Sequence, residues 1–91
     1  MARIRVSCIL VEAQSDARIL QDRINGGADF SSLAMTQSIH PSGVRGGDLG
    51  NLSRGQMEKA FDDVAFALSI GQITAVPIKG EAGWYIIYRA G

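Results

Sequence analysis

The chain has 91 residues, of which 46% are hydrophobic and 20% are charged. This composition predicts one small soluble globular domain over residues 1–91, because a chain of this length can bury about 60% of its unfolded surface and fill one core. Nine basic and nine acidic side chains give a formal charge of zero. Nucleic-acid-binding proteins need a basic surface, so we expect no nucleic acid among the partners.

Hydropathy and cysteine content limit the compartment and the cofactors. No apolar run approaches the roughly 20 residues that span a bilayer, and Met1-Ala2-Arg3 does not open a signal peptide. One cysteine excludes an internal disulfide and a multi-cysteine metal site. We expect a cytoplasmic monomer that contacts no membrane and carries no metal or cofactor, unless the domain has been excised from a larger exported chain.

The first third of the chain predicts one strand and two helices. Alternating apolar residues predict a strand over Ile4–Val11, with one face buried and the other partly buried. Ser15 is predicted to cap a helix that ends at Gly26-Gly27, because glycine readily adopts the backbone conformation of a helix end. Asp29 is predicted to cap a second, shorter helix.

The remainder predicts a loop, a helix and two strands. Proline and glycine residues over positions 38–55 predict a structured loop with one short strand near Leu49. Met57–Leu68 has apolar residues at helical spacing and predicts the clearest helix. Thr74–Ile78 and Trp84–Arg89 are predicted to be strands of a hairpin. This order indicates an α+β layer fold whose largely antiparallel sheet can pair its first and last strands.

Five sequence blocks in order carry a family resemblance. They are SCILV, NGGADFSSLA, SIHPSGVRGGDLG, RGQM with AFDDVAFAL, and GWYIIYRAG. Together they resemble the parvulin family of peptidyl-prolyl cis/trans isomerases over essentially the whole chain, and are closest to the small stand-alone bacterial members. The resemblance implies a four-stranded antiparallel sheet surrounded by four helices. It also implies non-covalent isomerisation of X-Pro bonds in unfolded or flexible protein segments, without a cofactor.

The chemistry of this family requires an apolar cup. Rotation about an X-Pro amide crosses a barrier of about 18–20 kcal/mol but breaks no bond. A catalyst must therefore hold the proline ring and favour the twisted amide through hydrogen bonds. By resemblance, Leu49, Met57 and Phe61 form the proline pocket, and proline-containing polypeptides are the substrates. Taken alone, Met57 and Phe61 at helical spacing are more simply read as core residues.

The polar residues depart from the usual family pattern. Parvulins usually have a histidine where Cys8 stands, a cysteine or aspartate where His40 stands, and a second histidine where Tyr85 stands. One hypothesis is that Cys8 and His40 exchange the family's histidine and cysteine, lie within hydrogen-bond reach, and act in catalysis with Tyr85 as a further donor. The alternative is a decayed network, which leaves a catalytically weak prolyl-peptide-binding chaperone module.

Three further expectations complete the sequence-based hypotheses. Phosphate-directed parvulins have a long basic loop after the first strand, whereas residues 12–16 are short and acidic, so we expect no phospho-specificity. A Cys8–His40 thiol dyad of hydrolase or redox type is weaker, since no oxyanion-hole motif or orienting third residue is evident. Asp48 is expected to accept backbone hydrogen bonds within the RGGDLG loop rather than to act as an acid.

Overall fold

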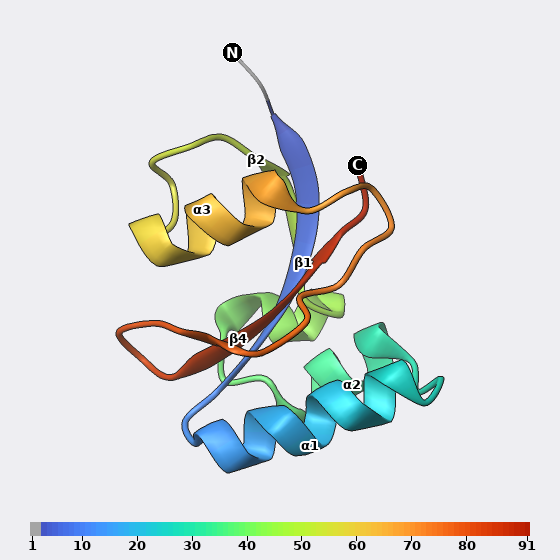
Figure 1. Ribbon diagram of the computed structural model, residues 1–91. Helices are drawn as coiled ribbons and strands as arrows, with labels where there is room; N and C mark the ends of the chain where they lie inside the picture. The colour runs from blue at the N-terminus through green and yellow to red at the C-terminus, as the bar shows by residue number, and fades with distance from the viewer. Residues whose placement is uncertain (1–2) are drawn as a thin grey trace.

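A four-stranded antiparallel sheet forms the centre of the computed structural model, which describes residues 3–91 (Figure 1). The two central strands, β1 (Ile4–Val11) and β4 (Trp84–Arg89), pair with each other along Val6–Val11. The outer strands are β2 (Asp48–Leu52), which pairs with β1, and β3 (Ile78–Lys79), which pairs with β4. The predicted α+β class and the predicted pairing of the first and last strands are therefore confirmed.

Helices cover both faces of this sheet (Figure 1). Helices α1 (Gln14–Asn25) and α2 (Phe30–Gln37) pack on one face, and α3 (Lys59–Ala67) packs on the other. A short 3-10 helix, η1 (Pro41–Arg45), leads into β2. Within residues 3–91, three α-helices and η1 stand where the resemblance implies four helices. Among these residues, no helix has the length and apolar character that a bilayer crossing requires.

The alternation along β1 divides the core in two. Cys8 and its neighbours two residues away on each side, Val6 and Leu10, face α3 and pack with Phe61. Ile9, in contrast, faces α1 and α2. Because all four of these β1 side chains are buried, the strand runs through the middle of the molecule. The predicted two-sided burial of this strand is confirmed.

Three predicted boundaries are wrong. Helix α1 begins directly after β1, so its N-cap is Ala13, and Ser15 lies in the first turn. Met57 lies before α3, whose N-cap is Glu58, and is therefore not on the same helix as Phe61. The first predicted strand of the hairpin, Thr74–Ile78, is reduced to β3 (Ile78–Lys79), because Thr74 meets Ile87 of β4 through separate hydrogen bonds rather than through a continuous ladder.

Candidate functional site

The segment that carries His40 is held against β1 by two hydrogen bonds, and a third forms within the segment. The Leu10 N–H donates to Ser38 Oγ over 3.1 Å, and the Ile39 N–H donates to the Leu10 carbonyl over 2.8 Å. The His40 N–H also donates to Ser38 Oγ, over 3.2 Å. Pro41 then begins η1 at a position where a helix needs no N–H donor. These bonds fix His40 beside the strand that carries Cys8.

Ser42 connects Cys8 to His40. Its Oγ lies 3.8 Å from Cys8 Sγ and 2.8 Å from His40 Nδ1. Cys8 and Ser42 are completely buried, whereas His40 is half-buried. A hydroxyl can donate and accept at once, so Ser42 replaces the expected direct hydrogen bond with a bridged one. The sequence prediction missed Ser42, and the only signal for it is its place in the SIHPSGVRGGDLG block.

The backbone sets the direction of this chain of hydrogen bonds. The Ser42 N–H donates to His40 Nδ1 over 3.0 Å, so Nδ1 is an acceptor and the neutral ring carries its proton on Nε2. The Ser42 hydroxyl then donates to Nδ1, and the Cys8 thiol donates to Ser42 Oγ. Among residues 3–91, Nε2 of His40 has no hydrogen-bond partner. Its N–H is therefore available to a ligand.

The thiol of Cys8 is protonated in this arrangement. Burial raises the pKa of Cys8 to about 11, although its hydrogen bond with Ser42 acts in the opposite direction. A nucleophilic cysteine must be a thiolate, so a hydrolase or redox dyad of Cys8 and His40 has no support in this geometry. Among residues 3–91, no group of three His, Cys, Asp or Glu side chains is arranged to hold a metal ion.

The environment of His40 predicts a pH-dependent stability. Burial, and then the positive charge of Arg45, hold the pKa of His40 below its ordinary value of 6.5. Between the folded and the unfolded pKa, the unfolded chain binds more protons than the folded chain. The free energy of unfolding contributed by His40 is therefore fully present above the unfolded pKa and falls as the pH drops through and below it.

Urea denaturation between about pH 7 and about pH 5 measures this effect. The control variant is His40→Asn, because an asparagine oxygen can still accept from the Ser42 N–H at the start of η1. We expect the parent to lose more stability than His40→Asn over this interval. Equal losses in the two proteins would show that His40 is not held in its neutral form.

An apolar cluster lies beside this polar chain. Phe61 and Tyr85 are buried, with ring centroids 5.0 Å apart in an edge-to-face arrangement of 80°. Leu49 from β2 and Met57 from the loop before α3 pack against this cluster and are half-buried. Cys8 belongs to the same cluster. The structure thus brings five predicted site residues together, and Ser42 joins the sixth, His40, to them.

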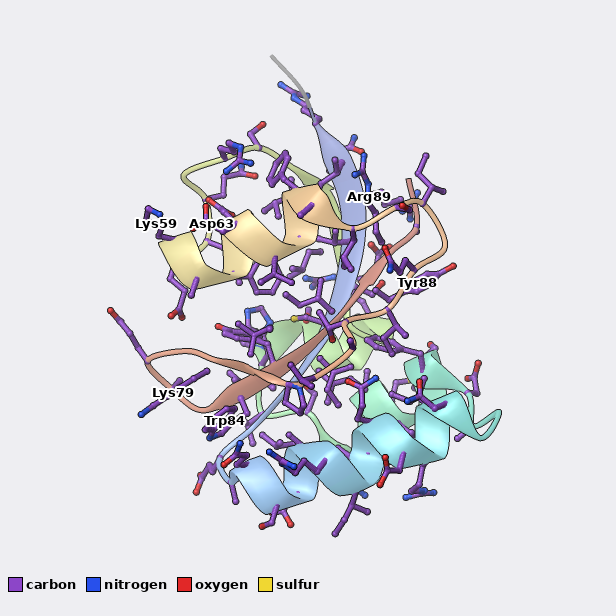
Figure 2. The ribbon with its side chains drawn as sticks, in the orientation of Figure 1. Lys59, Asp63, Lys79, Trp84, Tyr88 and Arg89 are labelled. Atoms are coloured by element: carbon purple, nitrogen blue, oxygen red, sulfur yellow. The ribbon has the colours of Figure 1, made fainter. Side chains whose placement is uncertain are left out.

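The hairpin between β3 and β4 is tied to the start of α3 next to Tyr85. The Glu81 N–H donates to the Glu58 carboxylate over 3.1 Å. Burial, followed by the negative charge of Glu58, raises the pKa of Tyr85 to about 12, so its hydroxyl stays protonated. Figure 2 shows Lys79 and Trp84 opposite each other on the same hairpin, where they pair across β3 and β4.

The RGGDLG loop is held by its aspartate. Oδ1 of Asp48 accepts from the Gly50 N–H over 2.7 Å, and Oδ2 pairs with Arg5 over 2.8 Å. These contacts hold the pKa of Asp48 below its usual range, with the backbone hydrogen bond as the largest cause. Asp48 is therefore an ionised structural residue, as predicted. Arg45 Nε donates to the Asp48 carbonyl over 3.4 Å.

Comparisons with known proteins place this fold and motif in one family. The family described as "PPIC-type PPIASE domain" matches residues 4–89. The chain is 37% identical over 86 residues to "Foldase protein PrsA 4" of Bacillus cereus, covering 93% of the chain and 30% of that protein. It is 42% identical over 71 residues to "Peptidyl-prolyl cis-trans isomerase Pin1" of Digitalis lanata, covering 78% of the chain and 59% of that protein.

Solved structures agree with these relatives. A crystal structure of PrsA from Bacillus anthracis superposes with a TM-score of 0.95 at 36% identity, covering 98% of this chain and 41% of that one. The solution structure of NmPin, "the parvuline of Nitrosopumilus maritimus", gives a TM-score of 0.88 at 39% identity, covering 100% of this chain and 98% of that one. The chain spans 30% or 31% of the PrsA proteins of Bacillus cereus and Geobacillus.

Proposed function

Because the chain belongs to the PPIC-type, or parvulin, family of peptidyl-prolyl isomerase domains, we propose that it isomerises X-Pro bonds in proline-containing polypeptides. The observation that carries this proposal is the Cys8–Ser42–His40 chain of hydrogen bonds next to the apolar cluster of Phe61 and Tyr85. The first provides oriented donors, and the second provides an apolar environment for a proline ring.

The apolar residues hold the substrate in this mechanism. We assign the proline ring to the half-buried surfaces of Leu49 and Met57, with Phe61 beneath them as a rigid support. A flexible thioether such as Met57 adapts its shape to a ring. Contact with these side chains removes water from the prolyl amide, which strengthens any hydrogen bond formed there.

The polar residues favour the twisted amide. The Nε2–H of His40 is the donor offered to the substrate, and Ser42 and Cys8 hold the imidazole in the tautomer that exposes it. The protonated hydroxyl of Tyr85, on β4 next to β1, is a second donor. Such donors accelerate rotation only if they bind the twisted amide more strongly than the planar one. No covalent bond forms or breaks, so a protonated Cys8 is compatible with this role.

A cis/trans assay with a short Ala-Pro tetrapeptide tests this function. Unaided exchange takes tens to hundreds of seconds, so catalysis is seen directly as faster exchange by NMR. The alternative, a chaperone module that binds prolyl segments with little catalysis, is favoured by the burial of Cys8 and Tyr85, which leaves few exposed donors. Chemical-shift changes at Leu49 and Met57 without faster exchange would support that alternative.

We also propose that phosphate is not recognised. The connection between β1 and α1 is only two residues long, and it places the exposed carboxylates of Glu12 and Asp16 near the start of α1. A phosphoserine before proline carries about −1.5 to −2 charges and would be repelled by these carboxylates, while residues 12–16 themselves supply no lysine or arginine. We expect a Ser-Pro peptide to bind as well as, or better than, its phosphorylated form in isothermal titration. A preference for the phosphopeptide of more than about tenfold, or about 1.4 kcal/mol, would contradict this.

Several properties stay predictions from the sequence. These are the single domain over residues 1–91, the monomeric state, the cytoplasmic location, and the absence of nucleic-acid and membrane partners. The foldase and chaperone names of the relatives support proteins in non-native states as the substrate class.

A further inference from the structure

The loop that carries Met57 begins with a tight turn over residues 53–56. The Gln56 N–H donates to the Ser53 carbonyl over 3.4 Å, which closes the turn. Gly55 stands at the third position of the turn with a φ of 94°. This combination is typical of a type II turn, whose third residue has a positive φ and is usually glycine. The side chain of Gln56 closes the turn a second time, because its Oε1 accepts from the Ser53 N–H over 2.8 Å.

A buried carboxyl group holds the central peptide of this turn. The N–H of the third residue makes no hydrogen bond within such a turn. Here the Gly55 N–H donates to Oδ2 of Asp62, on α3, over 2.8 Å. Asp62 is only 5% exposed, and its Oδ1 has no hydrogen-bond partner within residues 3–91. A buried oxygen without a partner lowers stability, so this aspartate is a costly core residue whose side chain serves the turn.

The other contacts between this turn and α3 are exposed. Arg54 lies 4.6 Å from the ring centroid of Phe66 and 3.6 Å from the Asp63 carboxylate, which also pairs with Lys59 (Figure 2). The side chains of Arg54 and Asp63 are 60% and 51% exposed. Ion pairs and cation–π contacts at exposed sites are weak. Asp62 is therefore the main anchor of the turn.

The conformation of the turn matters for the proposed proline pocket. Met57 follows two residues after Gly55 and packs against the apolar cluster of Phe61 and Tyr85. Glycine adopts both signs of φ readily, so a turn without this anchor samples more than one conformation. Met57 would then spend less time against the cluster, and the pocket would lose one of its walls.

We propose that Asp62 is a positioning residue of the proline pocket, which acts through Gly55 to keep Met57 in place. The proposal rests on the proposed function and deepens it, because it gives a role in substrate binding to a residue outside the pocket. Met57 contacts the proline ring alike in the planar and in the twisted amide. A loss of this contact therefore raises KM and leaves kcat unchanged.

Kinetics of matched variants test this role with an Ala-Pro tetrapeptide. Asp62→Ala removes the acceptor, and we expect KM to rise about tenfold with kcat unchanged. Asp62→Asn supplies an amide oxygen as acceptor, so its KM is expected to stay close to that of the parent. The control is Asp63→Ala, because it removes a carboxylate from the same helix together with the exposed contact to Arg54. We expect no change of KM in this control.

A double-variant cycle shows whether Asp62 acts through Met57. Met57→Ala by itself is expected to raise KM. Adding Asp62→Ala to Met57→Ala is expected to raise KM by less than about twofold further, because the side chain that Asp62 holds in place is already gone. An Asp62→Ala effect of the same size with and without Met57 would show a general loss of structure and overturn the proposal.

Gly55→Ala tests the turn without removing the carboxyl group. An added Cβ at Gly55 would meet nothing within 4 Å, so this variant disfavours the φ of 94° without a clash. We expect KM to rise in the same direction as in Asp62→Ala, which keeps the proposal testable if Asp62→Ala does not fold. An unchanged KM in Gly55→Ala, or in a folded Asp62→Ala, would overturn the proposal.

Peptide affinity separates this proposal from the proposed function. If the parent does not isomerise the tetrapeptide, the proposed function fails. The dissociation constant of the same tetrapeptide, measured from chemical-shift changes, then still compares the variants. Binding that is about tenfold weaker in Asp62→Ala than in Asp63→Ala would support the positioning of Met57, and no difference between these two variants would overturn it.

Discussion

Replacing Phe61 by alanine is expected to lower the free energy of unfolding by about 3–5 kcal/mol, the usual cost of removing a buried phenylalanine. Phe61 is completely buried and packs edge-to-face on Tyr85 with ring centroids 5.0 Å apart. Its removal leaves a cavity under β1 and takes away the support of the proposed proline pocket. Urea denaturation measures the loss.

The matched control is Phe66→Ala. Phe66 is also on α3 but is half-buried, with the Arg54 guanidinium 4.6 Å from its ring centroid. We expect a loss of less than about 2 kcal/mol there, because less apolar surface returns to water. Equal losses in the two variants would contradict the placement of Phe61 at the centre of the core. A domain of this size has a total stability of about 5–15 kcal/mol, and Phe61→Ala removes a large share of it. Met57→Ala is therefore the better probe of substrate binding.

Replacing Gly47 by alanine is expected to cost at least about 3 kcal/mol, because two penalties add. Gly47 has a φ of 86°, which L-residues rarely adopt. An added Cβ would also clash with the Cys8 carbonyl oxygen, where the Gly47 carbonyl accepts from the Cys8 N–H over 2.9 Å. The substitution therefore pushes the loop that follows His40 and Ser42 away from Cys8.

Gly50→Ala separates the two penalties. Gly50 has a similar φ of 68°, but an added Cβ would meet nothing within 4 Å. We expect this variant to lose only about 1 kcal/mol, from backbone strain alone. Thermal and urea unfolding of both variants measure the difference. A Gly47→Ala variant as stable as Gly50→Ala would contradict the close approach of the loop to β1.

The strands and helices with strong periodicity could be predicted from the sequence. Alternating apolar residues specify the strands β1 and β4, and the backbone preference of glycine specifies the end of α1. Both signals act between residues that are close together in the sequence. The ends of elements are less determined locally. Met57 continues the helical spacing of α3, yet the chain is extended at Glu58, so the helix starts one residue after Glu58.

The candidate site was predictable only in part for the same reason. The apolar residues were found through their motif positions, and they do share one cluster in the structure. Ser42 was missed because its role depends on Cys8, 34 residues away in the sequence. No local pattern distinguishes a serine that bridges two such groups from one that lies on a loop surface.

The most direct test of the bridged pair is the rate of cis/trans exchange of an Ala-Pro tetrapeptide, measured by NMR for the parent and for the variant Cys8→Ala with His40→Ala. Ile70→Ser is the control for an unrelated substitution, and denaturation curves establish that all three proteins are folded. We expect kcat/KM of the double variant to fall by at least about tenfold, or about 1.4 kcal/mol of transition-state stabilisation, with peptide affinity nearly unchanged. Exchange that is as fast with the folded double variant as with the parent would contradict a catalytic role for Cys8 and His40.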